Sequence, residues 1–379
     1  MPPEIERQLT PSLVVRSSQA MVLTGVRRCG KSTLLAQLMR REHSPFYCNF
    51  EDTRLFGMGP QDFSTFLSVL DELAGSRQPL FLDEVQEVEQ WQRLVRALLD
   101  RGRAVCVTGS NASLLGRELG AKLTGRHLSF EVFPFSYNEY LAYVGKQPGA
   151  QSLRAYLDDG GFPVFLRERN DLALQELLRD VVQRDVAARH RLRETRHVMN
   201  LLLFLLANTG QSVSFQRLTK GLGVPTVAQT SRYVEFLQDA YLVFAVAKFS
   251  SSFKQRVVAP AKYYAIDNGL RRSNSPQNQP DLGHRLENAV ALRLRRRTRQ
   301  LYYAGERDLW ECDFVTSDEA IQVCLELTPM NRAREIRGVL GAARLRGSRR
   351  ALVLTLDQTD KLREDGVDIK VLPAWRWLD

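Results

Sequence analysis

Gly25-Val-Arg-Arg-Cys-Gly-Lys-Ser32 is the stretch that decides the fold of the first third of the chain. Its glycines and its Gly-Lys-Ser ending have the spacing of a phosphate-binding loop, in which backbone N–H groups surround a phosphate at the start of a helix. An apolar segment (residues 20–24) precedes the loop, and apolar residues at helical spacing (residues 31–41) follow it. The stretch therefore predicts a strand, a nucleotide-binding loop and a helix in direct succession.

The residue types of this loop have chemical tasks that explain their spacing. Lys31 is placed to reach the β- and γ-phosphates of ATP, and the Ser32 hydroxyl is placed to ligate Mg²⁺. A glycine-rich turn without a ligand is the alternative, and the flanking strand and helix argue against it. The residues expected to contact the nucleotide are Gly25, Val26, Arg27, Arg28, Cys29, Gly30, Lys31, Ser32 and Thr33.

An acidic pair, Asp83-Glu84, follows a second apolar segment at residues 80–82. We expect Asp83 to hold Mg²⁺ directly or through water, and Glu84 to orient and activate the attacking water. A helix cap is the alternative for such a pair on its own. Together with the phosphate loop, the glutamate favours hydrolysis of ATP over binding alone.

Polar residues also follow two other apolar segments. Ser110 and Asn111 come after residues 105–108, and either could bond the γ-phosphate or the attacking water; Asn111 is our catalytic candidate, with an ordinary turn as the alternative. Asn49, at the end of residues 46–50, could contact Glu84.

The first third alternates short strands with helices. Residues 46–50, 79–82 and 104–108 read as strands, and residues 63–73 and 91–101 read as helices. This alternation predicts a parallel sheet with helices on both faces and a ligand at the carboxyl ends of the strands.

The pattern changes after about residue 145. Residues 152–206 are mostly helical, and residues 214–246 resemble a helix-turn-helix with strands of a wing at 244–249 and 262–266. Gln229 and Arg232 would face outward on its second helix, where contact with the DNA major groove is made. A small helical bundle that joins two domains is the alternative. Residues 271–283 read as a linker, and a smaller α/β unit follows.

Composition limits the remaining possibilities. Hydrophobic residues make up 44% and charged residues 25%, as in soluble globular proteins, and 379 residues predict several domains. The longest apolar run, residues 201–207, is too short for a membrane span, residues 1–16 show no secretory signal, and the five cysteines form no CxxC pair. We therefore expect a cytoplasmic protein without a membrane partner.

The net charge of +10 and the pI of about 9.5 favour a polyanionic partner. Basic residues concentrate in the second half, at residues 292–299 and 332–350. Arg295, Arg296 and Arg297 are therefore candidate DNA contacts, and a solvated basic face is the alternative.

Several strings of this sequence occur in the order typical of the AAA+ ATPases. More narrowly, the chain resembles a large prokaryotic family with an AAA-type core and a carboxy-terminal domain of unknown function. Besides the phosphate loop, the strings are Phe81-Leu-Asp-Glu-Val-Gln86, Val107-Thr-Gly-Ser-Asn111, Gly125-Arg126, Phe133-Pro-Phe-Ser-Tyr-Asn-Glu-Tyr140, Gly160-Gly-Phe-Pro163, Trp310-Glu-Cys-Asp-Phe-Val315 and Ile321-Gln-Val-Cys324.

The resemblance implies an α/β fold: a P-loop AAA+ core with a parallel sheet (residues 1–145), a helical lid (146–200), a winged-helix-like domain (201–270) and a small nuclease-like α/β domain (283–379). It also implies a ring of six or seven subunits with ATP at the subunit interfaces. Arg126 fits the role of an arginine finger that acts on the neighbouring subunit, and Arg117 is the second choice.

The last domain resembles the PD-(D/E)XK nuclease-like fold. Glu287 and Asp313 match two of its acids, but Gln322 stands where a further acid is usual and Cys324 where a lysine is usual. Such nucleases need two or more carboxylates for Mg²⁺ and a group that activates water. The domain is therefore expected to bind or dock without cleaving.

Three functions compete at this point. The first is a Mg²⁺-dependent ring ATPase that remodels or translocates DNA, including branched DNA. The second is a regulatory switch ATPase that presents its carboxy-terminal domain to a protein partner. The third is a DNA nuclease, against which Gln322 and Cys324 argue.

Overall fold

The computed structural model describes residues 5–16, 18–75, 77–110, 123, 125–250, 252, 259–275, 282–306, 308–348 and 350–379. The chain forms two compact units. The amino-terminal unit contains Glu4–Phe133 together with Asp239–Tyr241. The carboxy-terminal unit contains Pro134–Gln238 and Leu242–Asp379.

A parallel sheet forms the centre of the amino-terminal unit, as the sequence predicts. Its strands lie in the order β2-β3-β4-β1-β5, and each described neighbouring pair is parallel. The strands are β1 (Ala20–Thr24), β2 (Phe46–Asn49), β3 (Leu80–Asp83), β4 (Val105–Gly109) and β5 (His127–Glu131).

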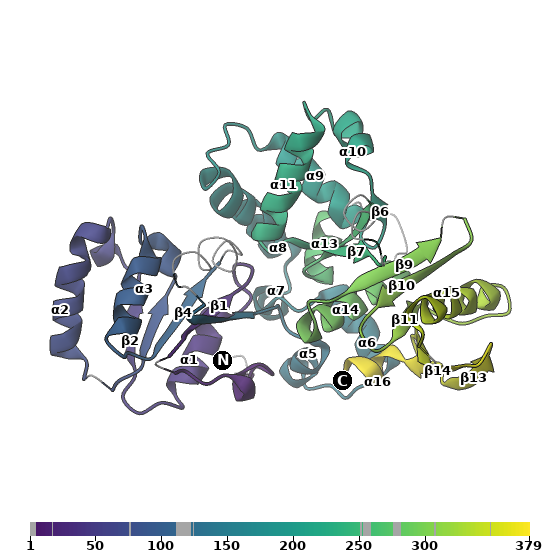
Figure 1. The fold of residues 1–379 in the computed structure, drawn as a ribbon, viewed down its shortest axis with the longest axis horizontal. Coiled ribbons are helices and arrows are strands. Elements are labelled where there is room, and N and C mark those ends of the chain that lie inside the picture. Colours follow the sequence, from purple (N-terminus) through teal and green to yellow (C-terminus); the bar gives the residue numbers. More distant parts are fainter. Residues whose placement is uncertain are drawn as a thin grey trace. The chain divides into compact units, whose positions relative to one another are not determined.

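Helices cover both faces of this sheet (Figure 1). Alternate residues of the central strands, such as Val22, Leu82 and Val107, pack in one core with the apolar sides of α2 and α3. The α-helices are α1 (Lys31–Met39), α2 (Phe63–Leu73) and α3 (Trp91–Asp100). The 3-10 helices are η1 (Thr10–Ser12), η2 (Thr53–Leu55), η3 (Pro60–Asp62) and η4 (Val85–Glu87).

The order of the strands brings the predicted site together. β4 lies between β1, which leads into the phosphate loop, and β3, which ends at Asp83. Because the strands are parallel, all three end at the same edge of the sheet, where ligands of such sheets bind.

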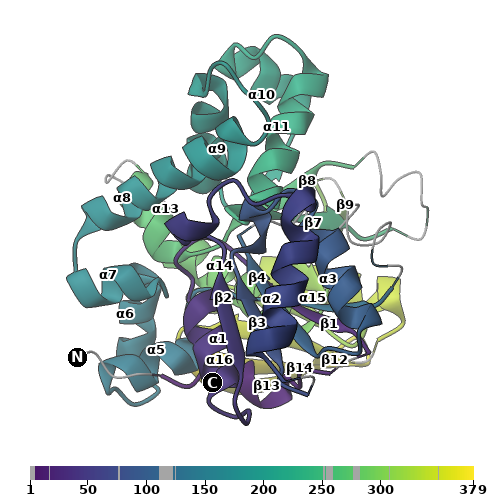
Figure 2. The same cartoon turned by 90° about the vertical axis from the view of Figure 1, so that its left-hand side faces the viewer.

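The carboxy-terminal unit begins with a run of helices, and α9, α10 and α11 lie side by side in both views (Figure 1 and Figure 2). The bond between the Thr219 and Thr230 hydroxyls, 2.7 Å, joins α10 to α11. Its helices are α5 (Tyr137–Val144), α6 (Ala150–Asp159), α7 (Pro163–Glu168), α8 (Asp171–Asp180), the π-helix η6 (Val181–Ala188), α9 (Arg196–Ala207), α10 (Phe215–Leu222), α11 (Val227–Asp239), α13 (Asn268–Asn274), α14 (Leu282–Arg297), α15 (Arg332–Arg346) and α16 (Ala374–Leu378).

Nine strands of the described chain form the sheet of this unit, in the order β13-β14-β12-β11-β10-β9-β7-β8-β6. They are β6 (Ser212–Val213), β7 (Val243–Lys248), β8 (Ala261–Ala265), β9 (Tyr302–Glu306), β10 (Trp310–Val315), β11 (Ala320–Val323), β12 (Arg350–Thr355), β13 (Asp360–Glu364) and β14 (Val367–Pro373).

The strands that the sequence assigned to a wing and those of the nuclease-like segment belong to one sheet. β7 pairs in parallel with β9, with Ala247 opposite Tyr302 and Lys248 opposite Tyr303. The expected division near residues 270–283 is therefore bridged by backbone hydrogen bonds. The expected linker is partly helical, because α13 extends to Asn274.

Within the described residues, no helix combines the length and the apolar character that crossing a membrane requires.

Candidate functional site

The phosphate loop has a backbone that requires its glycines. Gly25 and Gly30 have φ angles of +147° and +103°, in the region that L-residues rarely adopt. A Cβ at Gly25 would lie 2.1 Å from the carbonyl oxygen of Val132, which follows β5. The start of the loop is thus packed closely against the neighbouring strand, and the sequence interpretation of Gly25 is consistent with this geometry.

Lys31 is buried at the first position of α1, and its amine lies against the loop. Its Nζ donates to the carbonyl oxygens of Gly25 (3.0 Å) and Val26 (3.2 Å). Ser32 and Thr33 are exposed in the same helical turn. The donor set therefore fits a phosphate with its Mg²⁺: a preplaced ammonium, accessible hydroxyls and a helix N-terminus.

Arg7 lies outside the phosphate-loop motif and is hydrogen-bonded to the loop. Its Nη1 donates to the carbonyl of Cys29 (2.9 Å) and its Nη2 donates to the carbonyl of Phe133 (2.6 Å). The Arg7 side chain is buried, although arginine is rarely buried without partners. Sequence reasoning missed this residue because nothing in its local context marks it.

Asp83 lies at the end of β3, 2% exposed, with both carboxylate oxygens engaged. The Thr108 hydroxyl donates to its Oδ1, and the Tyr47 hydroxyl donates to its Oδ2 at 3.1 Å. Burial, followed by the negative charge of Asp83, raises the pKa of Tyr47 to about 12, so Tyr47 stays a donor. These contacts fix the Asp83 carboxylate at the carboxyl end of β3.

Thr108 is a β4 side chain that joins the acidic pair. Besides bonding Asp83, its Oγ1 accepts the backbone N–H of Glu84 at 3.0 Å. The sequence proposed Ser110 or Asn111 for a catalytic contact. Ser110 is buried, and Asn111 lies outside the described residues. Thr108 could have been found from the sequence, because it is a polar residue at the end of an apolar strand.

Glu84 is half-buried and has a left-handed backbone, with φ +52°. Its Oε2 accepts from Nε2 of Gln86. A non-glycine residue in this conformation is strained, and such strain is common at functional sites. Asn49 uses its Oδ1 to accept the backbone N–H of Glu51 (3.0 Å), and its contact with Glu84 stays a prediction.

The sequence analysis also singled out Cys29, in the phosphate loop, and Arg126, directly before β5. Burial raises the pKa of the Cys29 thiol, which keeps it protonated and unreactive. Arg126 Nη1 lies 2.5 Å from Oδ1 of Asp100, in a partly exposed ion pair that competes little with another partner. The second finger candidate, Arg117, lies outside the described residues.

The nuclease-like residues surround a lysine that sequence reasoning missed. Lys262 of β8, 3% exposed, places its Nζ 2.7 Å from Glu311, 3.6 Å from Asp313 and 3.9 Å from Glu287. Burial, and then the charge of Asp313, raise the pKa of Glu287. An internal ammonium therefore lies among carboxylates that would otherwise repel one another.

Gln322 and Cys324 add neither a carboxylate nor a cation to the cluster. Gln322 donates through Nε2 to Glu335 (2.8 Å) and accepts the Asp313 backbone N–H (3.3 Å). Burial, followed by the charges of Glu335 and Asp313, raises the pKa of Cys324 to about 12, so its thiol is neither a base nor a cation. Nowhere in the described part of the chain are three or more His, Cys, Asp or Glu side chains arranged to hold a metal ion.

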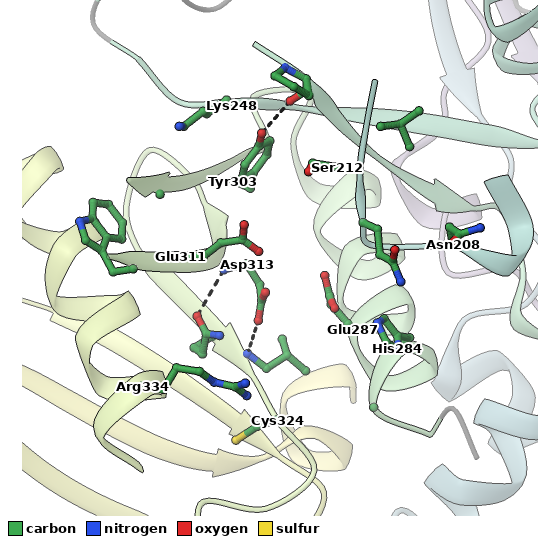
Figure 3. Close-up of a pocket in the computed structure, with 18 of the residues that line it drawn as sticks. Asn208, Ser212, Lys248, His284, Glu287, Tyr303, Glu311, Asp313, Cys324 and Arg334 are labelled. Atoms are coloured by element: carbon green, nitrogen blue, oxygen red, sulfur yellow. Dashed lines mark hydrogen bonds between the residues drawn. The ribbon is translucent and has the colours of Figure 1, made fainter. Parts of the chain in front are cut away.

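A groove of about 1550 Å³ opens over this cluster inside the carboxy-terminal unit. Figure 3 shows Glu311 and Asp313 close together, with Glu287 and His284 on the helix that faces them. The acids of its lining are Glu287, Glu306, Asp308, Glu311, Asp313, Glu326 and Glu335, and its Lys and Arg residues are Arg217, Lys248 and Arg334. The lining is thus predominantly acidic.

The candidate DNA contacts differ in how accessible they are. Arg232 and Arg297 are exposed, and Gln229 bonds the Tyr233 hydroxyl at 2.5 Å. Arg296 donates to the carbonyl of Pro134 (2.8 Å). The guanidinium of Arg295 lies 5.8 Å from the ring centre of Phe244. Arg295 and Arg296 therefore have structural roles that the charge pattern did not indicate.

Two family models match parts of the chain. Residues 17–141 match a family described as an AAA domain, and residues 150–281 match a domain of unknown function, DUF8612. The first match covers the phosphate loop, the acidic pair and Thr108. The second ends before α14, so the winged-helix and nuclease-like interpretations stay predictions.

Two relatives are similar along nearly the whole chain. A protein of Methanocaldococcus jannaschii described as uncharacterized is 29% identical over 99% of this chain and 90% of its own length. A Haemophilus influenzae protein, also described as uncharacterized, is 29% identical over 93% of each chain.

Two solved structures show weaker similarity. Cdc6p from Pyrobaculum aerophilum has a TM-score of 0.26 at 12% identity, over 60% of this chain and 80% of that chain. PCH-2 of C. elegans has a TM-score of 0.23 at 17% identity, over 58% and 60%. Similarity this low does not bear on function.

Proposed function

We propose that the AAA-type P-loop domain of residues 17–141 binds ATP with Mg²⁺ and hydrolyses it. One observation carries the proposal: Thr108 bonds both Asp83, the last residue of β3, and Glu84, which follows it, and β4 separates this pair from the strand that leads to Lys31. The basic end of a phosphate loop and the acidic pair thus end at one edge of one sheet. This is the arrangement that phosphoryl transfer to water needs.

In this proposal each residue of the site has a separate role. Lys31 holds the β- and γ-phosphates, Ser32 and Asp83 hold Mg²⁺, and Glu84 orients and deprotonates the attacking water. Mg²⁺ supplies charge neutralisation on the phosphates. Thr108 fixes the carboxylate of Asp83 and the backbone of Glu84, so it is a positioning residue.

We also propose that the chain acts on DNA, including branched DNA, as a ring of six or seven subunits. The α10–α11 pair with exposed Arg232 and the net charge of +10 support DNA binding. Arg126, whose guanidinium forms a partly exposed ion pair with Asp100, is the candidate finger toward a neighbouring subunit. Gln322 and Cys324, in the positions usually held by an acid and a lysine, argue against cleavage.

A regulatory switch ATPase is the second candidate, and the groove favours it. Its predominantly acidic lining repels a phosphate backbone and attracts a basic protein segment. In that case ATP controls when the carboxy-terminal unit is presented to a protein partner.

Steady-state ATP hydrolysis by the full chain tests these proposals, with Lys31→Ala as the blank. The rate is measured alone and with single-stranded, linear duplex and four-way-junction DNA. Stimulation by one form supports DNA-dependent activity and identifies the form. An equal rate with every DNA favours the regulatory switch, and a rate no higher than the blank overturns the ATPase assignment.

Glu84→Gln separates binding from hydrolysis. Removing the base should lower kcat by about 10²–10⁴-fold while the variant still binds and retains ATP. Glu87→Gln, three residues along, is the matched control, since Glu87 is exposed. Normal turnover by Glu84→Gln would show that another group activates the water.

A further inference from the structure

Arg7 joins the phosphate loop to the chain that follows β5. Its guanidinium donates from Nη1 to the carbonyl of Cys29 and from Nη2 to the carbonyl of Phe133, and the residue is 5% exposed. It also lies close to Gly30, where an added Cβ would meet Nη1 at 2.8 Å. All of these residues belong to the amino-terminal unit. Glycine at position 30 therefore leaves room for Arg7 and also adopts the positive φ of the loop.

The bond to Cys29 fixes the direction of one peptide group. In a planar trans peptide, the C=O of one residue and the N–H of the next point in opposite directions. Because Arg7 holds the Cys29 carbonyl, the Gly30 N–H points away from Arg7. Backbone N–H groups are the donors that surround a phosphate in loops of this kind. The orientation of a phosphate donor is thus set by a residue outside the loop.

The segment that carries Arg7 is itself hydrogen-bonded to α1. The Arg7 backbone N–H donates to Oε1 of Gln37 (3.1 Å), and Nε2 of Gln37 donates to the carbonyl of Ile5 (2.7 Å). Nη1 of Arg41 donates to the carbonyl of Thr10 (3.0 Å). Since α1 begins directly after the loop, these bonds place the Arg7 side chain relative to the helix N-terminus that would face a phosphate.

We propose that Arg7 is a positioning residue for nucleotide binding. It holds the peptide group between Cys29 and Gly30 in the orientation that a phosphate needs before the nucleotide arrives, and it acts through the loop without contacting the nucleotide. A site that already has its bound geometry loses less free energy to ordering when the ligand binds. The inference rests on the proposed binding of ATP, and it adds a residue that lies outside both the loop and the acidic pair.

Titration calorimetry of the full chain with Mg²⁺ and ADP, or with Mg²⁺ and a non-hydrolysable ATP analogue, tests the proposal. Arg7→Met keeps an unbranched side chain but has no N–H donors, so Kd should rise by about tenfold or more, as expected for the loss of charge-assisted hydrogen bonds. Arg7→Lys keeps the charge but cannot reach both carbonyls, so its Kd should lie between those of wild type and Arg7→Met. In steady-state hydrolysis KM should rise with Kd while kcat changes by less than about threefold, because the loop holds substrate and transition state alike.

Arg103→Met is the matched control. Arg103 is a buried arginine of the same unit, 3% exposed, and its Nη1 donates to the carbonyl of Ala74 (3.3 Å), at the end of α2. Its replacement should leave the Kd unchanged. Wild-type affinity in Arg7→Met, or equal losses in Arg7→Met and Arg103→Met, would overturn the proposal. If Arg7→Met does not fold, Arg7→Lys is the deciding variant, and a Kd equal to that of wild type overturns the proposal.

Hydrogen exchange without nucleotide separates this failure from a failure of the proposed function. Peptides that cover residues 25–33 should exchange faster in Arg7→Met than in wild type, because one peptide group of the loop is no longer fixed, and Arg103→Met should match wild type. Equal exchange of these peptides in wild type and Arg7→Met would contradict the role of Arg7. A wild-type chain that binds neither nucleotide would instead contradict the proposed function.

Discussion

At the scale of the residue, the site depends on a threonine that combines two bonds. Thr108 donates to Asp83 and accepts from the backbone of Glu84, so one hydroxyl sets the position of both acids. It is fully buried, so its hydroxyl is held in place by the packing around β4. The catalytic acids therefore depend on a neutral side chain from the adjacent strand.

Thr108→Val should lower kcat for ATP hydrolysis by at least about tenfold, with a smaller change in KM. Valine keeps the shape but leaves Asp83 and Glu84 without their shared partner. Thr230→Val, which removes a buried threonine hydroxyl in the carboxy-terminal unit, is the matched control. An unchanged kcat in Thr108→Val would show that the acids are held by other contacts.

At the scale of the element, the β7–β8 hairpin supplies the cation of the carboxylate cluster. Lys262 on β8 reaches Glu311 and Asp313 on β10 and Glu287 on α14. Its side chain also lies 5.3 Å from the ring centre of Tyr303 on β9. The hairpin is therefore linked electrostatically to the nuclease-like elements.

Lys262→Met should destabilise the carboxy-terminal unit by about 3 kcal/mol, because buried carboxylates lose their counter-charge. Chemical denaturation of the full chain measures the loss. Lys361→Met, on exposed β13, is the control and should stay within about 0.5 kcal/mol of wild type. If both variants unfold alike, Lys262 does not neutralise the cluster.

A second element, α13, is fixed through Asp267, which caps it. Asp267 accepts the backbone N–H groups of Leu270 (2.8 Å) and of Gly161 (2.6 Å), in the Gly-Gly-Phe-Pro turn. Burial raises the pKa of Asp267 to about 6, against the lowering by these bonds and by the charge of Arg296. The folded unit therefore binds a proton more tightly there than the unfolded chain does.

The contribution of Asp267 to stability is fully present below its pKa in the unfolded chain, about 4. It is lost as the pH rises through its pKa in the folded unit, about 6. The free energy of unfolding should therefore decrease as the pH rises across this range. Asp267→Asn should lower the free energy of unfolding overall, because one N–H loses its acceptor, and should flatten its slope between these pH values. Denaturant titrations at a series of pH values measure the slope, and equal slopes in both proteins would exclude Asp267 as its source.

At the scale of the whole molecule, the net charge of +10 and the acidic groove favour partners of opposite charge. The basic surface favours a polyanion, whereas the groove favours a basic segment. The dependence of DNA binding on salt tests the polyanion partner directly.

If DNA is the partner, its affinity should fall by about 10³-fold or more between 50 and 200 mM salt, because several phosphate contacts release counterions. Fluorescence anisotropy with labelled duplex measures the slope. Arg232→Gln should reduce the slope by about one unit, and Arg296→Gln, whose side chain bonds Pro134, is expected to act mainly through stability. A flat salt response would contradict the DNA proposal.

The sequence predicted the phosphate loop, the acidic pair and the alternation of strands and helices. It did not predict β13, β14 or α16, and it separated the wing strands from the later strands, which share one sheet. Short strands with exposed alternate residues resemble surface loops in sequence, and pairing between distant strands has no local signature.

What the sequence alone determined about this protein is local: a loop whose glycines adopt forbidden φ angles, a lysine at a helix start, and acids at a strand end. These features follow from neighbouring residues, so their spacing reveals them. The tertiary structure alone decided which distant side chains complete the sites: Arg7 on the loop, Thr108 beside Asp83, and Lys262 among the carboxylates. Such contacts arise from the order of the strands within each unit, and separation along the chain carries no information about them.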